Sequence, residues 1–484
     1  MKLAVLTPTP DFAKEIGDLV SLFFGDLVLS VNAGKEDADL LILHSENTMA
    51  GIRNAEVRLW GCVNAQAQNQ ERIYQDTLEE KRHHKRQVKK CVYDALTKGT
   101  GIRPPWGSLT GVRATRLLYE AMKTGLSIEE AARQVASEFD VSPDKTSLLE
   151  KIVTVQEGLL KPRKEDIDIY IGIPFCVSRC RYCSFLSGEI GKGRELAPYV
   201  DALVGEIGKA VKLIEDTGMK VRAFYMGGGT PTALSSELLA RVLDAAQPFI
   251  RTALEATVEA GRPDTLDREK LSLIKKAGAS RISINPQTMH DRTLEIIGRR
   301  HTRVQTEEAY AMARTLGFSH INMDLIAGLP GEDEAMFEQT LAWSRSLHPE
   351  SLTVHTLSIK RSSLMHLWKD SLPDGQMVAH MVDAGRAHAE ASGMQPYYLY
   401  RQKHQAGNLE NVGYALPNHA CLYNIDMMED VCNVLALGAG GISKRVDGDE
   451  ELIVRAPNVK DIRHYIERVD EMSDRKRKLF TEKQ

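Results

Sequence analysis

From about residue 167 onward the sequence alternates short apolar runs with helical segments, and this rhythm restricts the possible folds more than any other feature. The strand-like runs are Ile167–Ile173, Ala223–Met226, Ala256–Glu259, Arg281–Ile284, Asn322–Ile326 and Leu352–Leu357. Repetition of strand, helix and strand predicts right-handed crossovers and a parallel sheet. Six such units span about 200 residues, whereas a closed eight-stranded barrel takes about 250. We therefore expect an α/β fold whose centre is a partial barrel, open on one side.

Three cysteines, Cys176, Cys180 and Cys183, follow the first of these runs. A 4Fe–4S cluster normally takes its ligands from cysteine thiolates, one for each iron. Three ligands leave one iron open to a small molecule, so this spacing predicts a cluster that takes part in bond cleavage. A structural zinc site would need a further set of ligands. Seven cysteines in 484 residues are too sparse for a disulfide framework.

Other residues that could carry chemistry follow the later runs, where the active sites of such folds lie. Gly227–Thr232 reads GGGTPT, and glycines let backbone N–H and C=O groups approach a ligand. Glu259 ends a strand and could accept hydrogen bonds from ribose hydroxyls, with a surface glutamate as the equal alternative. Asp324 lies inside an apolar run, and a buried carboxylate needs a partner, for which Arg299 is the candidate.

The composition is that of an ordinary globular protein, with 43% hydrophobic and 26% charged residues. Its net charge of −4 gives no overall field for nucleic acid, so no nucleic-acid partner is expected. We find no signal-peptide pattern and no apolar run of about twenty residues, which predicts a cytoplasmic protein without a membrane span. Residues 81–90 are basic and could contact an anion or nucleic acid. We favour a solvated helix face, because Glu79 and Glu80 dilute the charge.

The length predicts two or three domains. Residues 1–160 are expected to form a small N-terminal α/β and helical extension, with Ser127 and Glu130 as a capping-box signature. Within it we expect strands at Leu3–Leu6, Leu27–Val31, Leu40–Leu43 and Val57–Trp60, a helix at Phe12–Phe24, and two or three short helices after residue 108. Residues 161–361 would be the partial barrel. Residues 362–484, with a helix at Met377–Ala391, would be an accessory domain that closes it.

Together these motifs resemble the radical S-adenosylmethionine enzymes. The resemblance rests on Tyr170–Phe185, the GGGTPT run, Glu259 and Asp324–Pro330. It is closer to the oxygen-independent coproporphyrinogen III oxidase (coproporphyrinogen dehydrogenase) family, and the long N-terminal extension is similar to that of the HemZ-type branch. The resemblance covers roughly residues 165 to 445 and implies a partial (β/α)6 radical S-adenosylmethionine barrel.

The resemblance also implies a set of cofactor ligands. Cys176, Cys180 and Cys183 would hold a 4Fe–4S cluster, and a first S-adenosylmethionine would chelate its open iron. The family positions that contact this molecule correspond to Tyr170, Gly228 and Glu259. A second S-adenosylmethionine is expected at Tyr182, Gly229, Thr230, Gln287, Arg299, Asp324, Ser358 and Ile442. No catalytic side chain is implied beyond the cluster and S-adenosylmethionine.

The implied reaction converts propionates of coproporphyrinogen III to vinyl groups and gives protoporphyrinogen IX, in anaerobic haem biosynthesis. An electron from a donor such as flavodoxin or ferredoxin would reduce the cluster and cleave the sulfonium. The resulting 5′-deoxyadenosyl radical would abstract a propionate β-hydrogen, and loss of carbon dioxide and one further electron would leave the vinyl group. Such a radical must be shielded from water, which accounts for an enclosing accessory domain.

Two departures from the family pattern keep other functions open. Two residues after the third ligand, the well-studied coproporphyrinogen enzymes have another cysteine, whereas this chain has Phe185, as a sister group of haem chaperones does. The chaperones' C-terminal His-Asn…Tyr-Trp pattern corresponds here to Glu410–Ala415, which lacks the histidine and the tryptophan. The alternatives are therefore a haem-binding chaperone and a radical methyltransferase that acts on haem.

Overall fold

The computed structural model describes the chain except for Asp26, Gly34, Val112, residues 185–187 and 191–195, Arg361, Lys369, and residues 371–372, 403–404, 448–451 and 483–484. Phe185, on which one departure from the family rests, thus lies outside the described residues. By its internal contacts the chain separates into two compact units, residues 1–150 and residues 151–484. The division into three parts at residues 160 and 361 stays a prediction.

The first unit is built on a five-stranded sheet with the strand order β2-β1-β3-β4-β5. Its strands are β1 (Lys2–Leu6), β2 (Val28–Val31), β3 (Leu40–Met49), β4 (Ile52–Gly61) and β5 (Ala65–Arg72). β1 runs parallel to β2 and β3, and β3, β4 and β5 are antiparallel neighbours. The four predicted strands are confirmed. β5 was missed, because its sequence AQAQNQER alternates alanine with polar residues and gives a weak apolar signal.

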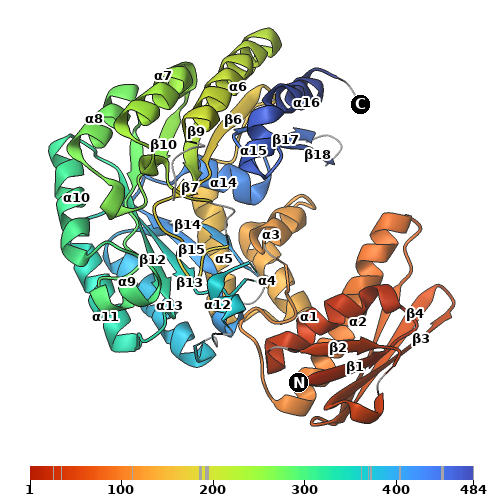
Figure 1. The fold of residues 1–484 in the computed structure, drawn as a ribbon. Coiled ribbons are helices and arrows are strands. Elements are labelled where there is room, and N and C mark those ends of the chain that lie inside the picture. The colour runs from red at the N-terminus through yellow and green to blue at the C-terminus, as the bar shows by residue number, and fades with distance from the viewer. Residues whose placement is uncertain are drawn as a thin grey trace. The chain divides into compact units, whose positions relative to one another are not determined.

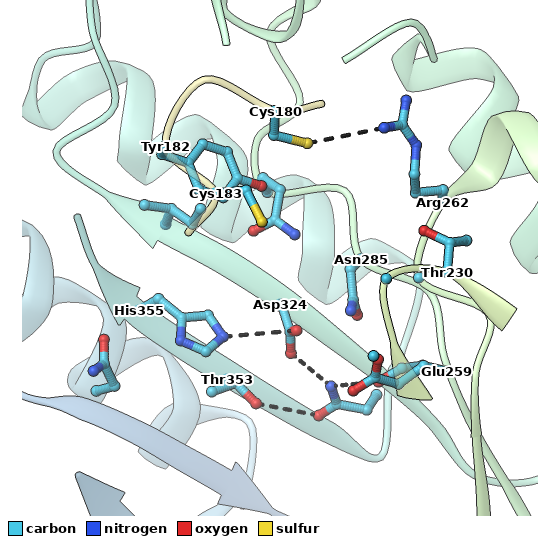
Figure 2. A pocket seen from close by; sticks show the side chains of 18 of the residues that line it. Cys180, Tyr182, Cys183, Thr230, Glu259, Arg262, Asn285, Asp324, Thr353 and His355 are labelled. Atoms are coloured by element: carbon cyan, nitrogen blue, oxygen red, sulfur yellow. Dashed lines mark hydrogen bonds and ion pairs between the residues drawn. The ribbon is translucent and has the colours of Figure 1, made fainter. Parts of the chain in front are cut away.

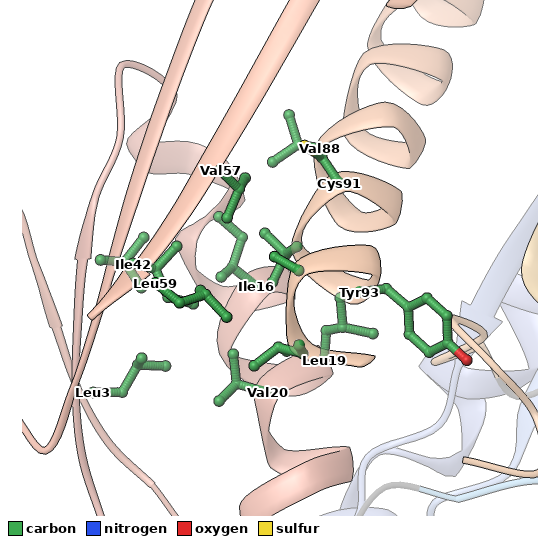
Figure 3. Packing of buried hydrophobic residues seen from close by; sticks show 14 of the residues in the cluster. Leu3, Ile16, Leu19, Val20, Ile42, Val57, Leu59, Val88, Cys91 and Tyr93 are labelled. Carbon is green, nitrogen blue, oxygen red and sulfur yellow. The ribbon is translucent and has the colours of Figure 1, made fainter. Parts of the chain in front are cut away.

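Two long helices, α1 (Ala13–Phe24) and α2 (Thr77–Thr100), pack against this sheet and enclose the core of the unit (Figure 3). Alternate side chains of a strand point to one face, and Leu3, Ile42 and Val57 bring three strands into the same buried cluster. Ile16 of α1 and Val88 of α2 complete it from the helix side. The predicted helix at Phe12–Phe24 is confirmed as α1.

Three short helices follow, as expected, namely α3 (Thr115–Met122), α4 (Ile128–Phe139) and α5 (Pro143–Gln156). The predicted capping box at the start of α4 is present. The Glu130 backbone N–H donates to Ser127 Oγ at 3.2 Å, and the Ser127 backbone N–H donates to Glu130 Oε2 at 2.9 Å. Two helix-terminal N–H groups that would otherwise lack partners are thereby satisfied.

The second unit contains an eleven-stranded sheet, and its centre is the predicted partial barrel. Six strands lie side by side in sequence order: β6 (Asp166–Ile173), β9 (Lys220–Gly228), β10 (Glu255–Glu259), β11 (Arg281–Ser283), β12 (Ile321–Ala327) and β13 (Ser351–Thr356). All neighbouring pairs among them are parallel. The predicted strands and the partial (β/α)6 barrel are confirmed.

The helices that connect these strands lie on the outer side of the sheet (Figure 1). They are α6 (Leu196–Thr217), α7 (Ser236–Thr252), α8 (Arg268–Ala277), α9 (Asp291–Ile296), α10 (Arg303–Thr315) and α11 (Glu334–Ser346). A parallel pair of strands requires a crossover, and a helix is the usual way to make it while covering the apolar face of the sheet. The inner face is left for polar side chains.

Residues after 361 add strands to both edges of the same sheet. β15 (Asn411–Ala415) runs antiparallel to β13, and β14 (Gln395–Tyr400) runs antiparallel to β15. At the other edge β16 (Asn433–Leu437) runs parallel to β6 and continues into the hairpin of β17 (Ile442–Asp447) and β18 (Leu452–Pro457). The strand–helix rhythm fades in this part of the sequence because antiparallel strands need no crossover helix.

Helices α12 (Leu364–Leu367), α13 (Gly375–Ala391), α14 (Leu422–Glu429), α15 (Ile462–Glu467) and α16 (Val469–Thr481) accompany these strands. The predicted helix at Met377–Ala391 is confirmed as α13. Among the described residues, no helix combines the length and the apolar character needed to cross a membrane.

Candidate active site

A cavity of ≈ 410 Å³ is lined by residues from the ends of the barrel strands, from the loops that follow them and from the inner faces of β12 and β13 (Figure 2). It brings together most residues that the sequence singled out. Those that line it are Cys176, Cys180, Tyr182, Cys183, Gly228, Gly229, Thr230, Glu259, Gln287, Arg299, Asp324 and Ser358. Tyr170 and Ile442 are not part of the lining.

The cysteine loop begins at β7 (Phe175–Cys176), which follows β6 directly in the sequence. β7 pairs with β8 (Gly188–Glu189). Backbone contacts anchor the loop, since the Arg181 N–H donates to Ile297 O at 2.9 Å and Ser178 Oγ donates to Gly298 O at 3.1 Å. All three cysteines are free thiols and all three line the cavity. The sequence spacing thus corresponds to three sulfurs presented to one space.

Arg262, which the sequence analysis did not identify, lies against this loop. Its Nη1 donates to Ser178 O at 3.0 Å and approaches Cys180 Sγ at 3.9 Å (Figure 2). Two further nitrogens contact Asp264 at 3.1 and 3.0 Å, which fixes the guanidinium plane. A fixed cation beside thiolates offsets the negative charge that they carry as metal ligands. The sequence signal that could have identified Arg262 was its position, three residues after the end of the barrel strand β10 at Glu259.

The glycines of the GGGTPT turn are required by close backbone approach. Gly228 has φ = +108°, and a Cβ there would lie 2.9 Å from the backbone nitrogen of Ile173. A Cβ on Gly229 would lie 3.0 Å from Cys176 Sγ and 2.6 Å from the carbonyl oxygen of Phe175. The turn is therefore packed against the cysteine loop, and it leaves its polar backbone beside the sulfurs.

Glu259, at the end of β10, is half-buried and accepts a hydrogen bond from the hydroxyl of Tyr225. Burial raises the pKa of Glu259 to about 7, because the charged carboxylate loses its hydration there, and the hydrogen bond from Tyr225 offsets only part of this. Nearby Asp324 raises it further. A carboxyl group of this kind can exist in either protonation state near neutral pH.

Asp324 lies on the inner face of β12, and its partners are Asn322 and His355 instead of the expected Arg299. Asn322 Nδ2 donates to its Oδ1 at 2.7 Å, and His355 Nε2 lies 3.6 Å from its Oδ2 (Figure 2). The hydroxyl of Tyr400 lies 3.2 Å from the other ring nitrogen of His355. Burial alone would raise the pKa of Asp324, but the hydrogen bonds and charge of these neighbours outweigh it and lower the pKa.

The expected pairing of Arg299 with Asp324 is wrong. Arg299 Nη1 donates to the backbone carbonyls of Asn285 at 2.9 Å and Gly261 at 3.2 Å, and its Nη2 donates to the hydroxyl of Tyr182 at 3.3 Å. These acceptors turn the guanidinium toward the cysteine loop and away from β12. The charge of Arg299 therefore lies at the sulfur end of the cavity.

The remaining predicted residues occupy different environments. Gln287 has φ = +71° and its backbone N–H and C=O bond to Asp324 and Ile326 of β12, so its conformation is fixed by the neighbouring strand. Ser358 lies in the loop after β13 and lines the cavity. Tyr170 is stacked in a row with Tyr225 and Tyr423, with ring centroids 6.4 and 6.1 Å away. Ile442 begins β17 and is 49% exposed. Their roles as cofactor contacts stay predictions.

Lys360 and His355 also line the cavity and escaped the sequence analysis. His355 lies on β13 two residues after Thr353, which is the register partner of Asp324. The strand sequence SLTVHT gives no sign of a functional histidine. Lys360 follows β13 in the same loop as Ser358. Among the described residues it has no ion-pair partner, and burial lowers its pKa. A position after a barrel strand was the signal that could have found it.

The donor set fits an iron–sulfur cluster with an organic ligand beside it. Three thiols face one space, and the glycine turn leaves room that a Cβ would fill. In addition, buried polar atoms of lining residues lack hydrogen-bond partners within the described structure, namely Thr257 Oγ1, Asn285 Oδ1 and Arg299 Nε. Such atoms are rare unless water or a ligand satisfies them. A polar ligand in the cavity would supply their partners.

Comparison with known families agrees with this geometry. The model of the radical SAM superfamily matches residues 170–344, a segment that holds the three cysteines, the glycine turn, Glu259 and Asp324. The chain is therefore a radical S-adenosylmethionine protein, a class that uses a 4Fe–4S cluster and S-adenosylmethionine.

The particular family follows from a relative of nearly equal length. The chain is 37% identical over 482 residues to the oxygen-independent coproporphyrinogen-III oxidase-like protein HemZ of Bacillus subtilis, covering 96% of this chain and 95% of that protein. It belongs to this HemZ family. The haem chaperone HemW of the same organism is 34% identical over 238 residues, covering 48% of this chain and 62% of that one.

A solved structure confirms the fold. Coproporphyrinogen III oxidase (HemN) from Escherichia coli superimposes with a TM-score of 0.53 at 22% identity, covering 66% of this chain and 72% of that chain.

Proposed function

We propose that the protein uses S-adenosylmethionine to decarboxylate propionate side chains of coproporphyrinogen III oxidatively, giving the vinyl groups of protoporphyrinogen IX. The observation that carries this proposal is a cavity whose lining contains the three cysteines, the glycine turn and the side chain of Lys360. The full-length likeness to a coproporphyrinogen-III oxidase-like protein supports it.

Cys176, Cys180 and Cys183 would hold the 4Fe–4S cluster, with Arg262 offsetting the charge of the thiolates. Gly228 and Glu259 would bind the first S-adenosylmethionine through backbone groups and the carboxylate. Together the cluster and this molecule would supply an electron and a 5′-deoxyadenosyl radical. Exclusion of water from the occupied cavity would protect such a reactive species from side reactions.

Asp324, Arg299 and Tyr182 would contact a second S-adenosylmethionine. Asp324 carries a lowered pKa and so favours the anion that would attract a sulfonium or an ammonium group. The unpartnered Arg299 Nε and Asn285 Oδ1 offer one donor and one acceptor nearby. Gln287, Gly229 and Thr230 lie on the same lining.

Lys360 is the residue to which we assign recognition of a substrate propionate. It is a half-buried ammonium whose pKa is lowered by burial, so an arriving carboxylate would relieve the cost of burying the charge. His355 and Tyr400 extend from Asp324 on the inner face of the sheet, and they could donate hydrogen bonds to a second polar group of the substrate.

A haem chaperone is the second candidate, favoured by one observation: relatives named haem chaperone match about half of the chain, 48% and 54% of it in two cases. These matches leave about half of the chain unmatched. The His-Asn…Tyr-Trp pattern of those proteins is replaced here by Glu410–Ala415. In the structure Asn411 is buried, and its Oδ1 accepts from the Thr356 backbone at 2.8 Å.

The deciding experiment is anaerobic turnover of the reconstituted protein with coproporphyrinogen III, S-adenosylmethionine and a reductant such as flavodoxin. Porphyrin products and 5′-deoxyadenosine are followed by mass spectrometry, with haem titration in parallel. We expect monovinyl and divinyl products from the wild type and none from Cys180→Ala. Stoichiometric haem binding with unchanged coproporphyrinogen III would contradict the proposal and favour the chaperone.

A matched pair of variants tests the substrate assignment. Lys360→Gln should raise KM for coproporphyrinogen III about tenfold or more, the cost of losing a charge-assisted hydrogen bond. Lys360→Arg keeps the charge and should stay close to the wild type. An equal KM in all three proteins would show that Lys360 does not contact the substrate.

A further inference from the structure

Three side chains of metal-ligating types converge in the interior of the second unit. They are Asp168 of β6, Asp426 of α14 and Cys432, which directly precedes β16. One ligand atom from each, a carboxylate oxygen or the sulfur, lies within 4.8 Å of the other two. The three residues are fully buried, with exposed fractions of 0%, 0% and 1%. They do not line the main cavity, so the cluster is separate from the site described above.

The backbone of the neighbouring strand directs Asp168 into this cluster. The pairing of β6 with β9 is irregular at this point, and two residues of β9, Arg222 and Ala223, lie opposite the single residue Asp168. Such a bulge changes the direction of nearby side chains. The Ala223 N–H donates to Asp168 Oδ1 at 3.2 Å, which fixes the carboxylate.

The segment after α14 brings Cys432 back to Asp426. Asp430 ends the helix with a left-handed conformation, φ = +54°, and the Val431 N–H donates to the Asp426 carbonyl oxygen at 3.3 Å. The chain therefore reverses before it enters β16, which runs beside β6. Two segments far apart in the sequence thus supply the three ligand atoms.

Two carboxylate oxygens of the cluster, Asp168 Oδ2 and Asp426 Oδ1, have no hydrogen-bond partner within the described structure. The other oxygen of each carboxylate is used, since Ala223 donates to Asp168 Oδ1 and Arg222 Nε donates to Asp426 Oδ2 at 2.6 Å. A buried carboxylate oxygen without a partner is costly and rare. A bound cation would satisfy both oxygens at once.

The nearby cations offset only part of the negative charge. Arg222 pairs with Asp426 at 2.6 Å, and Lys444 pairs with Asp430 at 2.7 Å. Within the described residues Asp168 forms no ion pair, although Arg222 and Lys444 lie near enough to attract its charge. A thiol that coordinates a metal loses its proton. Two carboxylates and a thiolate would then face the single charge of Arg222, and a divalent cation would neutralise the group.

We propose that Asp168, Asp426 and Cys432 bind a divalent metal ion, with zinc as the best match, and that this ion joins α14 and β16 to the first barrel strand. A thiolate among the ligands favours zinc over Mg²⁺ and Ca²⁺, which take oxygen ligands. Ligand atoms on a tetrahedral zinc ion lie about 3.3–3.6 Å apart, given bond lengths of about 2.0–2.3 Å. Small rotations of the three side chains would close them around the ion, and a water molecule would complete four ligands.

The test is metal analysis of the full chain after its iron–sulfur cluster is reconstituted, zinc sulfate is added in slight excess and unbound zinc is removed by gel filtration. We expect about one zinc per chain beside about four irons. Cys432→Ser and Asp168→Asn nearly keep the side-chain shapes, and each should lose most of the zinc and keep the iron. Cys62→Ser, a change of an exposed cysteine, is the matched control and should keep both metals.

Thermal unfolding gives a second measurement. Zinc should raise the Tm of the wild type and of Cys62→Ser by several degrees and leave the Tm of Cys432→Ser unchanged, because an ion that binds only the folded state stabilises it. Equal zinc contents in the wild type and a folded Cys432→Ser or Asp168→Asn protein would overturn the proposal. So would iron-loaded wild type without zinc, which would mean that water or a shared proton satisfies the carboxylates.

Folding of the variants is checked by circular dichroism. If neither variant folds, X-ray absorption at the zinc edge of the iron-loaded wild type decides the question. One sulfur and at least two oxygen ligands are expected for the ion at Cys432. Three sulfur ligands, or none, would overturn the proposal, since they would place the zinc at the cysteine loop or at the protein surface.

Discussion

At the scale of single residues, the cavity holds two carboxyl groups that the fold treats in opposite ways. Glu259 is half-buried beside the hydroxyl of Tyr225, and loss of hydration raises its pKa to about 7. Asp324 is also half-buried, but an amide and a histidine face it, and its pKa falls. Pairs of groups whose environments separate their pKa values are typical of functional sites.

The raised pKa of Glu259 predicts a pH dependence of stability. The folded state binds this proton more tightly than the unfolded chain does, so its contribution is fully present below about pH 4.5 and is lost as pH rises through about 7. Glu259→Gln cannot ionise. Relative to the variant, the cluster-free wild type should therefore lose up to roughly 3 kcal/mol between these pH values, at about 1.4 kcal/mol per pKa unit.

Urea unfolding of both proteins at a series of pH values measures this difference. The exposed Glu308→Gln is the control and should leave the pH dependence of the wild type in place. A constant difference between wild type and Glu259→Gln from acid to neutral pH would show that this carboxyl group is not perturbed in the folded chain.

Gly228 gives a second prediction at this scale. In Gly228→Ala the new Cβ would meet the backbone of Ile173 at a φ of +108°, which side chains rarely adopt. We expect a loss of about 2 kcal/mol or more in the free energy of unfolding, together with weaker S-adenosylmethionine binding. Gly205→Ala is the matched control, because Gly205 lies in α6 with open space around it and should gain about 0.5–1 kcal/mol.

Denaturant unfolding and anaerobic calorimetry measure the two effects separately. Unchanged binding by a stable Gly228→Ala protein would remove the glycine turn from the cofactor site.

At the scale of elements, one buried carboxylate ties the C-terminal segments to the barrel. Glu206 of α6 accepts hydrogen bonds from Lys476 of α16 at 2.5 Å, from Tyr465 of α15 at 2.6 Å, from Asn458 at 3.0 Å and from the Gly438 N–H at 2.8 Å. Lys476 and Glu206 are both almost fully buried. These contacts hold α15, α16 and the turn before β17 against a helix of the barrel.

Lys476→Met should therefore destabilise the chain by about 3 kcal/mol, because it leaves a buried carboxylate without its counter-charge. The double variant Glu206→Gln/Lys476→Met removes both charges and should recover part of the loss. Lys478→Met, an exposed change on the same helix, should stay within about 0.5 kcal/mol of the wild type. Thermal unfolding of the four proteins checks the order. A Lys476→Met protein as stable as the Lys478→Met control would show that the ion pair contributes nothing.

At the scale of the whole molecule, the main cavity belongs to one of the two compact units. The cysteines and every other residue that lines it lie in residues 151–484. We predict that a chain shortened to residues 143–484 assembles a full 4Fe–4S cluster, with about four irons per chain.

Iron and sulfide analysis of the purified shortened chain measures the cluster content. The same shortened chain with Cys180→Ala is the control and should contain little iron. A soluble shortened chain without iron would mean that the first unit is needed to form the site.

The sequence by itself determined the elements whose apolar patterns are local. The six barrel strands, the helix α1 and the capping box at Ser127 were predictable, because apolar runs and capping residues are local signals that extend over a few positions. The cysteine spacing and the glycine turn were readable for the same reason, since each motif lies within a single loop. β5 was not predictable, because its alanines and glutamines become a strand only when β4 pairs with them.

Only the tertiary structure decided which distant side chains meet. Asp324 and Arg299 looked like a pair by charge, yet Asp324 faces His355 across neighbouring strands, and Arg299 is held by the carbonyls of Asn285 and Gly261. Arg262 and Lys360 joined the site because strand register brings their loops to one cavity. Charge and residue type are properties of the sequence, but partnership depends on geometry, since hydrogen bonds and ion pairs act only over a few ångströms.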